Sequence, residues 1–176
     1  SVKTTGTLTE VLHALGDRIV SEFAGIEPNP SYETLMQAVE IVKREKIDFL
    51  LAVGGGSVID GTKFIAAASV FDGDCRDILK TRGSTIKHAL PIGVVLTLSA
   101  TGSEMNNGGV VTVKSTHTKS AFFSEKLFPQ FSILDPTKTY TLSPRQVGNG
   151  VVDAFVHITE QYLTYPANAP VQDRFA

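Results

Sequence analysis

The sequence has few of the features that mark secreted, membrane or nucleic-acid-binding proteins. Its 176 residues include one cysteine, Cys75, so an internal disulfide is excluded and a reducing compartment, the cytoplasm, is expected. No apolar run approaches the roughly 18 residues of a membrane span, and no basic segment followed by an apolar one opens the chain, so we expect no membrane anchor and no secretion signal. Lysine and arginine do not cluster and the formal net charge is −2, which argues against nucleic acid as a partner.

The residues that are present predict one α/β domain. Hydrophobic residues make up 42% of the chain, enough for the core of an ordinary domain. Runs with helical spacing alternate with short continuous apolar runs typical of buried strands, which predicts a parallel sheet covered on both faces. The expected helices cover 8–23, the segment after the capping Ser31, 58–69 and 144–164; the expected strands cover 49–53, 90–98 and 131–134, and a hairpin joins 109–113 to 120–124.

Three glycines and a serine, at 54–57, separate the strand 49–53 from the helix that follows. Glycine lets the backbone approach a pyrophosphate closely, and the first turn of a helix presents unpaired N–H groups and a positive dipole end. A tight turn without a ligand is the alternative, but such a turn needs one glycine rather than three. The segment predicts a phosphate-binding turn, although Ile59 stands where the dinucleotide fingerprint G-x-G-x-x-G requires glycine.

The last expected helix has two contrasting faces. Ser143, Pro144 and Gln146 form a capping box with proline at the first position, and Tyr165-Pro166 is expected to end the helix. The apolar stripe consists of Val147, Val151, Phe155, Ile158 and Tyr162, and the opposite polar stripe consists of Asn149, Asp153, His157 and Gln161. From the pattern alone, the polar stripe is the solvated side of an amphipathic helix.

Two residues of the polar stripe also have the chemistry of metal ligands. Asp153 and His157 are spaced i and i+4, so they project from one face closely enough to share a cation. A carboxylate oxygen with an imidazole nitrogen suits Fe(II) or Zn(II). Two ligands cannot close a metal site, and the other histidines, His13, His88 and His117, are expected to be surface or packing residues.

Four motifs occur together along the chain: GGGSVIDGTK (54–63), LTLSATGSE (96–104), ILDP (133–136) and PRQVGNGVVDAFVH (144–157). In this order they resemble the iron-type, or group III, alcohol dehydrogenases, in the branch of NADPH-dependent aldehyde reductases and butanol dehydrogenases. The resemblance implies a Rossmann-like nucleotide-binding domain over 1–142 and the first helix of an all-helical metal-binding domain over 143–176. It further implies that the chain is a fragment of an enzyme about twice as long, that both ends are cut, and that the complete enzyme is a homodimer.

The resemblance also assigns roles to individual residues. Gly55, Gly56 and Ser57 would hold the cofactor pyrophosphate, and Asp60 would lie toward the nicotinamide. Further cofactor contacts would come from Thr97, Thr101 and Lys119, for which a turn or capping role (the threonines) or a solvated position (the lysine) is the alternative. Asp153 and His157 would be the first two metal ligands, and Ser1 would end a second glycine-rich turn near the adenosine ribose. Lys63 receives no role, because a solvent-facing or salt-bridged position explains it equally well.

The reaction implied is hydride transfer between NADP(H), preferred over NAD(H), and a short aliphatic aldehyde or alcohol, assisted by a divalent metal, Fe(II) or Zn(II). Glycerol dehydrogenase and dehydroquinate synthase have a similar fold. The segments 97–104 and 148–157 nevertheless match the alcohol dehydrogenase pattern more closely. A nucleotide-binding fragment without turnover is the remaining alternative, because two metal ligands are missing from the sequence.

Overall fold

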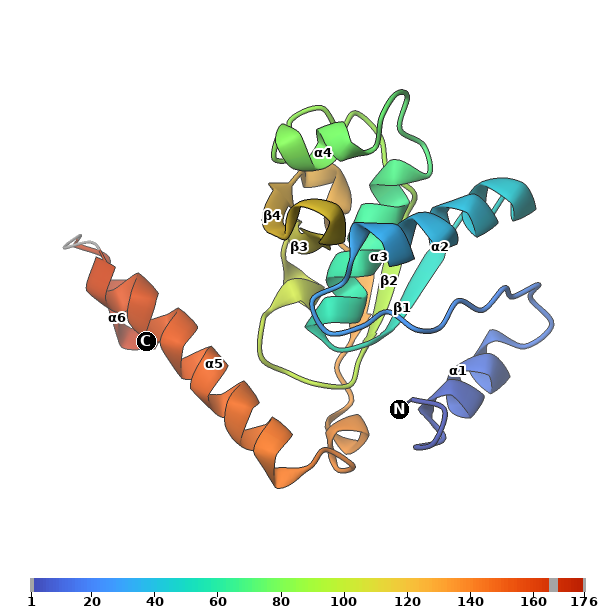
Figure 1. Ribbon diagram of the computed structural model, residues 1–176. Helices are drawn as coiled ribbons and strands as arrows, with labels where there is room; N and C mark the ends of the chain where they lie inside the picture. The colour runs from blue at the N-terminus through green and yellow to red at the C-terminus, as the bar shows by residue number, and fades with distance from the viewer. Residues whose placement is uncertain (1, 165–167, 176) are drawn as a thin grey trace.

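A three-stranded parallel sheet forms the centre of the structure (Figure 1). The computed structural model describes residues 2–164 and 168–175. The sheet has the strand order β1 (Leu50–Gly54), β2 (Ile92–Leu96) and β5 (Phe131–Ile133), and an antiparallel hairpin joins β3 (Gly108–Val113) to β4 (Thr118–Phe123). The predicted parallel sheet and hairpin are therefore confirmed.

Helices and short 3-10 turns make up the rest of the regular structure in the described chain. The helices are α1 (Thr7–Leu15), α2 (Tyr32–Glu45), α3 (Gly56–Ala68), α4 (Arg76–Lys80), α5 (Pro144–Thr164) and α6 (Pro170–Phe175). The 3-10 turns are η1 (Ser103–Met105), η2 (Lys114–Thr116), η3 (Glu125–Leu127) and η4 (Pro136–Thr139). Within the described residues, no helix is long and apolar enough to cross a membrane.

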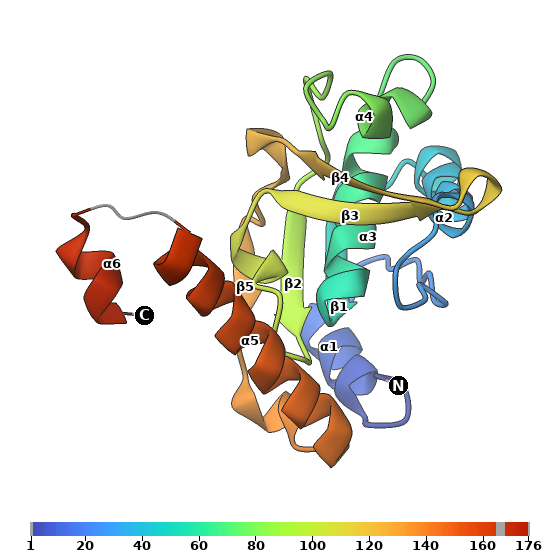
Figure 2. The ribbon, with the colours of Figure 1, turned by 60° about the vertical axis from the view of Figure 1, so that its left-hand side comes forward.

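Helix α3 is the element around which the domain packs, and the hairpin crosses it (Figure 2). Ile59 and Ala66 face the sheet, whereas Phe64 packs edge-on against Phe122 of the hairpin with ring centroids 5.8 Å apart. Small residues on α3 allow close approach, since a Cβ on Gly61 would lie 2.8 Å from the Leu35 side chain of α2. Burial on every side explains why α3 consists mainly of glycine, alanine and other apolar residues.

The face of the sheet that points away from α3 is less well covered. Phe131 packs over Gly93 and stacks on Phe49, with ring centroids 6.0 Å apart. Phe131 and Ile133 nevertheless remain 46% and 49% exposed. The cover expected on both faces is therefore incomplete within the described residues.

The helix predicted at 8–23 is wrong in its second half. Helix α1 ends at Leu15, because Gly16 adopts a positive φ of 61° that leaves the helical region. Residues 18–27 then run without regular structure. Ile19 is fully exposed in this segment, whereas Phe23 and Ile26 pack against the main core. The helical spacing of Leu15, Ile19 and Phe23 therefore did not reflect a common face.

The starts of α2 and α5 confirm the predicted caps. The Thr34 N–H donates to Ser31 Oγ at the start of α2. At the start of α5, the Gln146 N–H donates to Ser143 Oγ and the Ser143 N–H donates to Gln146 Oε1, both at 3.3 Å. Helix α5 is described as far as Thr164, and the predicted stop at Tyr165 and Pro166 lies outside the described residues.

Helix α5 projects from the domain (Figure 1), and its apolar stripe is exposed. Val151, Phe155 and Tyr162 are all more than half exposed. On the polar stripe, Asp153 is half-buried toward the body of the domain. The two faces thus differ from a simple amphipathic helix, in which the apolar face packs inward and the polar face is solvated.

Candidate functional site

Two loops meet at the carboxyl edge of the parallel sheet. Strand β1 leads into the turn 54–57 and α3, and β2 leads into residues 97–107, which we call the β2 loop. The Thr97 N–H donates to the Gly54 carbonyl at 3.0 Å and ties the two loops together at their bases. Ligands of open α/β sheets bind outside the carboxyl ends of the strands, so this edge is the candidate cofactor site. It holds the predicted residues Gly55, Gly56, Ser57, Thr97 and Thr101.

The three glycines of the turn provide space rather than an unusual backbone, because none of them has a positive φ. A Cβ on Gly54 would lie 2.7 Å from Val58 Cγ2, and a Cβ on Gly56 would lie 2.6 Å from Thr101 Oγ1, so both make room for protein atoms. A Cβ on Gly55 would meet only Leu98 among its neighbours, with the nearest atom at 3.3 Å. Gly55 caps α3 with an extended backbone, and it is the glycine whose missing side chain leaves room for a ligand at the helix start.

Asp60 binds the protein through both carboxylate oxygens. Oδ1 accepts a hydrogen bond from Ser103 Oγ at 2.8 Å, and Oδ2 accepts one from the Val110 N–H at 2.9 Å. Burial raises the pKa of Asp60 above its usual range, and these hydrogen bonds oppose that rise. Asp60 thus connects α3 to the β2 loop and to β3, while its placement toward the nicotinamide stays a prediction.

Thr101 and Lys119 each bind another residue of the protein. The Thr101 hydroxyl donates to Ser103 Oγ at 3.0 Å and accepts from the Ser103 N–H at 3.3 Å, so it extends the Asp60 network to the exposed part of the β2 loop. Lys119, in β4, donates to Asn29 Oδ1 at 2.8 Å in the turn before α2. Lys119 is therefore exposed but held by a partner, and its reach toward a cofactor stays a prediction.

Lys63 contradicts the expectation of a solvent-facing or salt-bridged residue. Its side chain is completely buried, and its ammonium donates to protein oxygens of the segment 103–108 rather than to a carboxylate. Burial lowers the pKa of Lys63 to about 8, against the opposing effect of the Asp60 and Glu104 carboxylates. The ammonium is therefore mostly charged at neutral pH. Sequence reasoning missed this role, because nothing within α3 marks the lysine as inward-facing.

Asp153 and His157 lie one above the other on α5. Asp153 Oδ2 and His157 Nε2 are 3.7 Å apart, and both side chains are about half exposed, at 45% and 51%. A carboxylate oxygen and an imidazole nitrogen at this separation are able to approach one cation from the same side. In the part of the chain that the structure describes, no cluster of three or more histidine, cysteine, aspartate or glutamate side chains could hold a metal. The pair is thus half of a possible site.

A hollow of about 250 Å³ lies between Asp153 and the β2 loop. Its lining comes from Leu98 and Ala100 of the β2 loop and from Gln146, Asn149, Gly150 and Asp153 of α5. Gly150 is buried, and a Cβ there would lie 2.8 Å from the Ser99 carbonyl oxygen. The glycine therefore allows α5 to approach the β2 loop closely. Its importance could not be inferred from the sequence, because the glycine lies in the middle of a helix.

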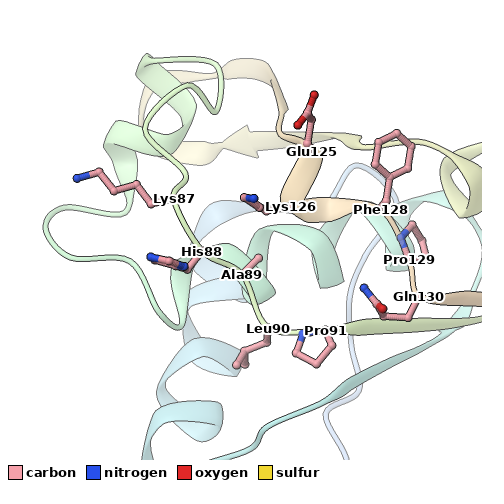
Figure 3. Close-up of a pocket in the computed structure, with 10 residues that line it drawn as sticks. All are labelled: Lys87, His88, Ala89, Leu90, Pro91, Glu125, Lys126, Phe128, Pro129 and Gln130. Carbon is pink, nitrogen blue, oxygen red and sulfur yellow. The ribbon is translucent and has the colours of Figure 1, made fainter.

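A larger groove, of about 520 Å³, lies at the opposite edge of the sheet (Figure 3). Lys87 to Pro91, just before β2, and Phe128 to Gln130, just before β5, line it together with Glu125 and Lys126. These are the amino ends of the strands, and none of the predicted site residues reaches them. His88 is one of the lining residues, as expected for a histidine near the surface.

Family and structural comparisons agree with this geometry. The model of the iron-containing alcohol dehydrogenases matches residues 1–136, and the chain belongs to this family. It is 61% identical to the NADPH-dependent aldehyde reductase YqhD of Escherichia coli, covering 100% of this chain and 46% of that protein. It is 49% identical to the probable NADH-dependent butanol dehydrogenase 1 of Bacillus subtilis, covering 99% of this chain and 45% of that protein.

The solved structures give the same result. The crystal structure of E. coli YqhD matches with a TM-score of 0.97 and 60% identity, over 99% of this chain and 45% of that chain. The NADH-dependent butanol dehydrogenase A of Thermotoga maritima matches with a TM-score of 0.85 and 40% identity, over 90% of this chain and 40% of that one. These matches confirm the predicted Rossmann-like α/β fold and the family of oxidoreductases. The chain spans less than half the length of these relatives.

Proposed function

We propose that this chain is part of a metal-dependent oxidoreductase that transfers hydride between NADP(H) and a short aliphatic aldehyde or alcohol. Residues 1–142 would form its nucleotide-binding domain, and residues 143–176 would begin its helical metal-binding domain. The complete enzyme would be a cytoplasmic homodimer. The observation that carries the proposal is the hollow between the β2 loop and α5, because it places Asp153 beside the loop that begins at the candidate cofactor site.

Each half of the site has residues that fit the group assigned to it. Gly55, Gly56 and Ser57 would bind the pyrophosphate, because the first turn of α3 offers N–H groups and Gly55 leaves space above them. Asp153 and His157 would hold Fe(II) or Zn(II) from one side. When bound, the metal would polarise the carbonyl oxygen and the nicotinamide would exchange hydride with the carbonyl carbon.

The uncovered apolar stripe of α5 supports a second domain beside it. Val147, Val151, Phe155, Ile158 and Tyr162 are all at least 43% exposed. A contiguous apolar surface of this kind marks an interaction site. We infer that further helices pack there, and that the same helical domain supplies the two metal ligands that are missing from this chain.

The proposal is tested on the full-length protein with NADPH and a short aliphatic aldehyde, following NADPH absorbance. We expect turnover that is lost after chelation and restored by Fe(II) or Zn(II). If the protein binds nucleotide but shows no turnover under any metal condition, it is a nucleotide-binding module and not an oxidoreductase. Turnover with glycerol but not with aldehydes would favour a glycerol-dehydrogenase-like enzyme.

Cofactor preference gives a first quantitative prediction. We expect kcat/KM with NADPH to exceed that with NADH by at least about tenfold, a difference of roughly 1.4 kcal/mol in transition-state stabilisation. The similarity to an NADPH-dependent reductase at 61% identity supports this, against an NADH-dependent relative at 49%. The assignment of Ser1 to the turn near the adenosine ribose also supports it, although Ser1 lies outside the described residues. A hydroxyl and N–H groups bind a 2′-phosphate, which a carboxylate would repel.

Steady-state rates with both cofactors at one aldehyde concentration measure this preference. Equal efficiency with the two cofactors, or a preference for NADH, would overturn the prediction.

Replacing Gly150 with alanine tests the contact between α5 and the β2 loop. The added Cβ would meet the Ser99 carbonyl at 2.8 Å, so the helix or the loop must shift. Because small displacements in an active site are costly, we expect kcat to fall by about tenfold or more. Gly148→Ala is the matched control, since its Cβ meets nothing within 4 Å in the described structure and both changes raise helix propensity equally. Equal rates for the two variants would show that the close approach has no functional role.

A further inference from the structure

Lys63 makes an unusual set of contacts for a lysine in the middle of a helix. Its Nζ lies 2.7 Å from the Ser103 carbonyl oxygen and 2.8 Å from the carbonyl oxygens of Asn106 and Gly108 and from Asn106 Oδ1. An ammonium has three hydrogens, so four acceptors use its full donor capacity with one hydrogen shared. All four belong to the six-residue segment 103–108, which contains the single turn η1 and ends at Gly108, the first residue of β3.

The charge of Lys63 and the conformation of this segment depend on each other. A fully buried ammonium is costly unless polar groups surround it, and in the described structure no carboxylate oxygen lies within 4.0 Å of Nζ. The converging carbonyl dipoles provide the compensation. Without the lysine, the three carbonyl oxygens would lose this donor and Asn106 Oδ1 would keep only the Gly108 N–H, so the segment would rearrange toward water.

The segment held by Lys63 is continuous with the cofactor edge. Ser103, whose carbonyl binds Lys63, donates its hydroxyl to Asp60 at 2.8 Å and accepts from Thr101 at 3.0 Å. Thr101 in turn packs against Gly56 in the glycine turn. Asp60 and Lys63 are one helical turn apart on α3, so one face of the helix forms hydrogen bonds with the β2 loop at two points.

We propose that Lys63 is a positioning residue for cofactor binding, which fixes the β2 loop so that Thr101 and Ser103 stay against the glycine turn. The inference rests on the proposed function in one respect, the binding of the cofactor at this edge. Lys63 itself does not reach the turn or the hollow, and it acts through the backbone of 103–108.

Two measurements on the full-length protein test the role in Lys63→Met, with Lys43→Met, an exposed lysine on α2, as the control. Amide hydrogen exchange should rise at least about tenfold in peptides covering 101–110 and stay unchanged in α2, because local opening becomes easier. The KM for NADPH should rise at least about tenfold, while the KM for aldehyde changes less than about threefold, since the loss is confined to cofactor positioning. Unchanged exchange in 101–110, or equal increases of both KM values, would overturn the inference.

A second pair of variants decides the matter if Lys63→Met does not fold. Asn106 is exposed, and its Oδ1 accepts from both the Lys63 ammonium and the Gly108 N–H. Asn106→Leu removes this acceptor and should raise the KM for NADPH by about three- to tenfold, whereas Asn106→Asp keeps an oxygen there and should stay within about twofold of wild type. Identical values for the two variants would contradict the proposal. If the wild-type protein binds no nicotinamide cofactor at all, the proposed function fails, whereas the exchange measurement still reports on the loop.

Discussion

Alanine in place of either Asp153 or His157 is expected to deprive the full-length enzyme of its tightly held metal and of nearly all turnover. The two side chains lie 3.7 Å apart on α5, and Asp153 lines the hollow that reaches the β2 loop. A four-ligand zinc site contributes about 10–16 kcal/mol of apparent binding free energy, so one ligand corresponds to about 3 kcal/mol, or more than a hundredfold in affinity. Binding of NADPH should persist, because the glycine turn is on another element.

Metal content and NADPH binding distinguish this result from simple unfolding. Metal is measured by elemental analysis after dialysis, and NADPH affinity is measured by fluorescence titration on the same samples. Gln161→Ala is the matched control, since Gln161 is an exposed residue of the polar stripe one turn beyond His157. If metal content and rate remain near wild type in both ligand variants, the stripe is a solvated helix face and the metal assignment fails.

The parts of the fold that were predictable have signals within a few residues of each other. The apolar run before Gly54, the three glycines and the following helix predicted β1, the turn and α3 together. The capping box at Ser143 and Gln146 predicted the start of α5 in the same way. Such signals depend on local backbone geometry, and packing elsewhere in the chain does not change them.

Periodicity failed at α1, where one residue decides the outcome. Leu15, Ile19 and Phe23 have helical spacing, but Gly16 turns the chain at a φ of 61° and the apolar residues beyond it make separate contacts. Spacing records which residues are apolar, and it does not register where the backbone leaves the helix. A glycine inside a helical pattern can therefore mark the end of the helix.

Lys63 and Gly150 were beyond sequence reasoning for a different reason. The acceptors of Lys63 lie 40 to 45 residues further along the chain, and the Ser99 carbonyl that Gly150 approaches belongs to another element. Both residues matter through contacts that exist only once the β2 loop has packed on α3 and α5. Asp60 is similar, because its partners Ser103 and Val110 lie 43 and 50 residues further along the chain.

Valine at position 55 is expected to abolish cofactor binding while the domain still folds. Gly55 has φ −93° and ψ −170°, an extended conformation that suits a β-branched residue. Its Cβ would meet only Leu98, whose Cβ lies 3.3 Å away, so the β2 loop at Leu98 must shift by a few tenths of an ångström to accommodate it. The valine methyl groups would then fill the space above the first N–H groups of α3, where a pyrophosphate must approach. We expect NADPH affinity to fall by at least about a hundredfold, or 2.7 kcal/mol.

Neighbouring glycines show why position 55 is the informative one. Alanine at Gly54 or Gly56 would clash with Val58 or Thr101 at 2.7 and 2.6 Å, so those variants would disturb the protein itself. Gly55→Ala, in contrast, adds a single methyl group and should give an intermediate loss of affinity, which orders the series by the volume placed at the helix start. Fluorescence titration with NADPH measures the affinity, and a thermal midpoint within a few degrees of wild type shows that folding is intact. An affinity that stays the same in both variants would mean that the phosphates bind elsewhere, and that the glycine turn serves only the packing of β1 against α3.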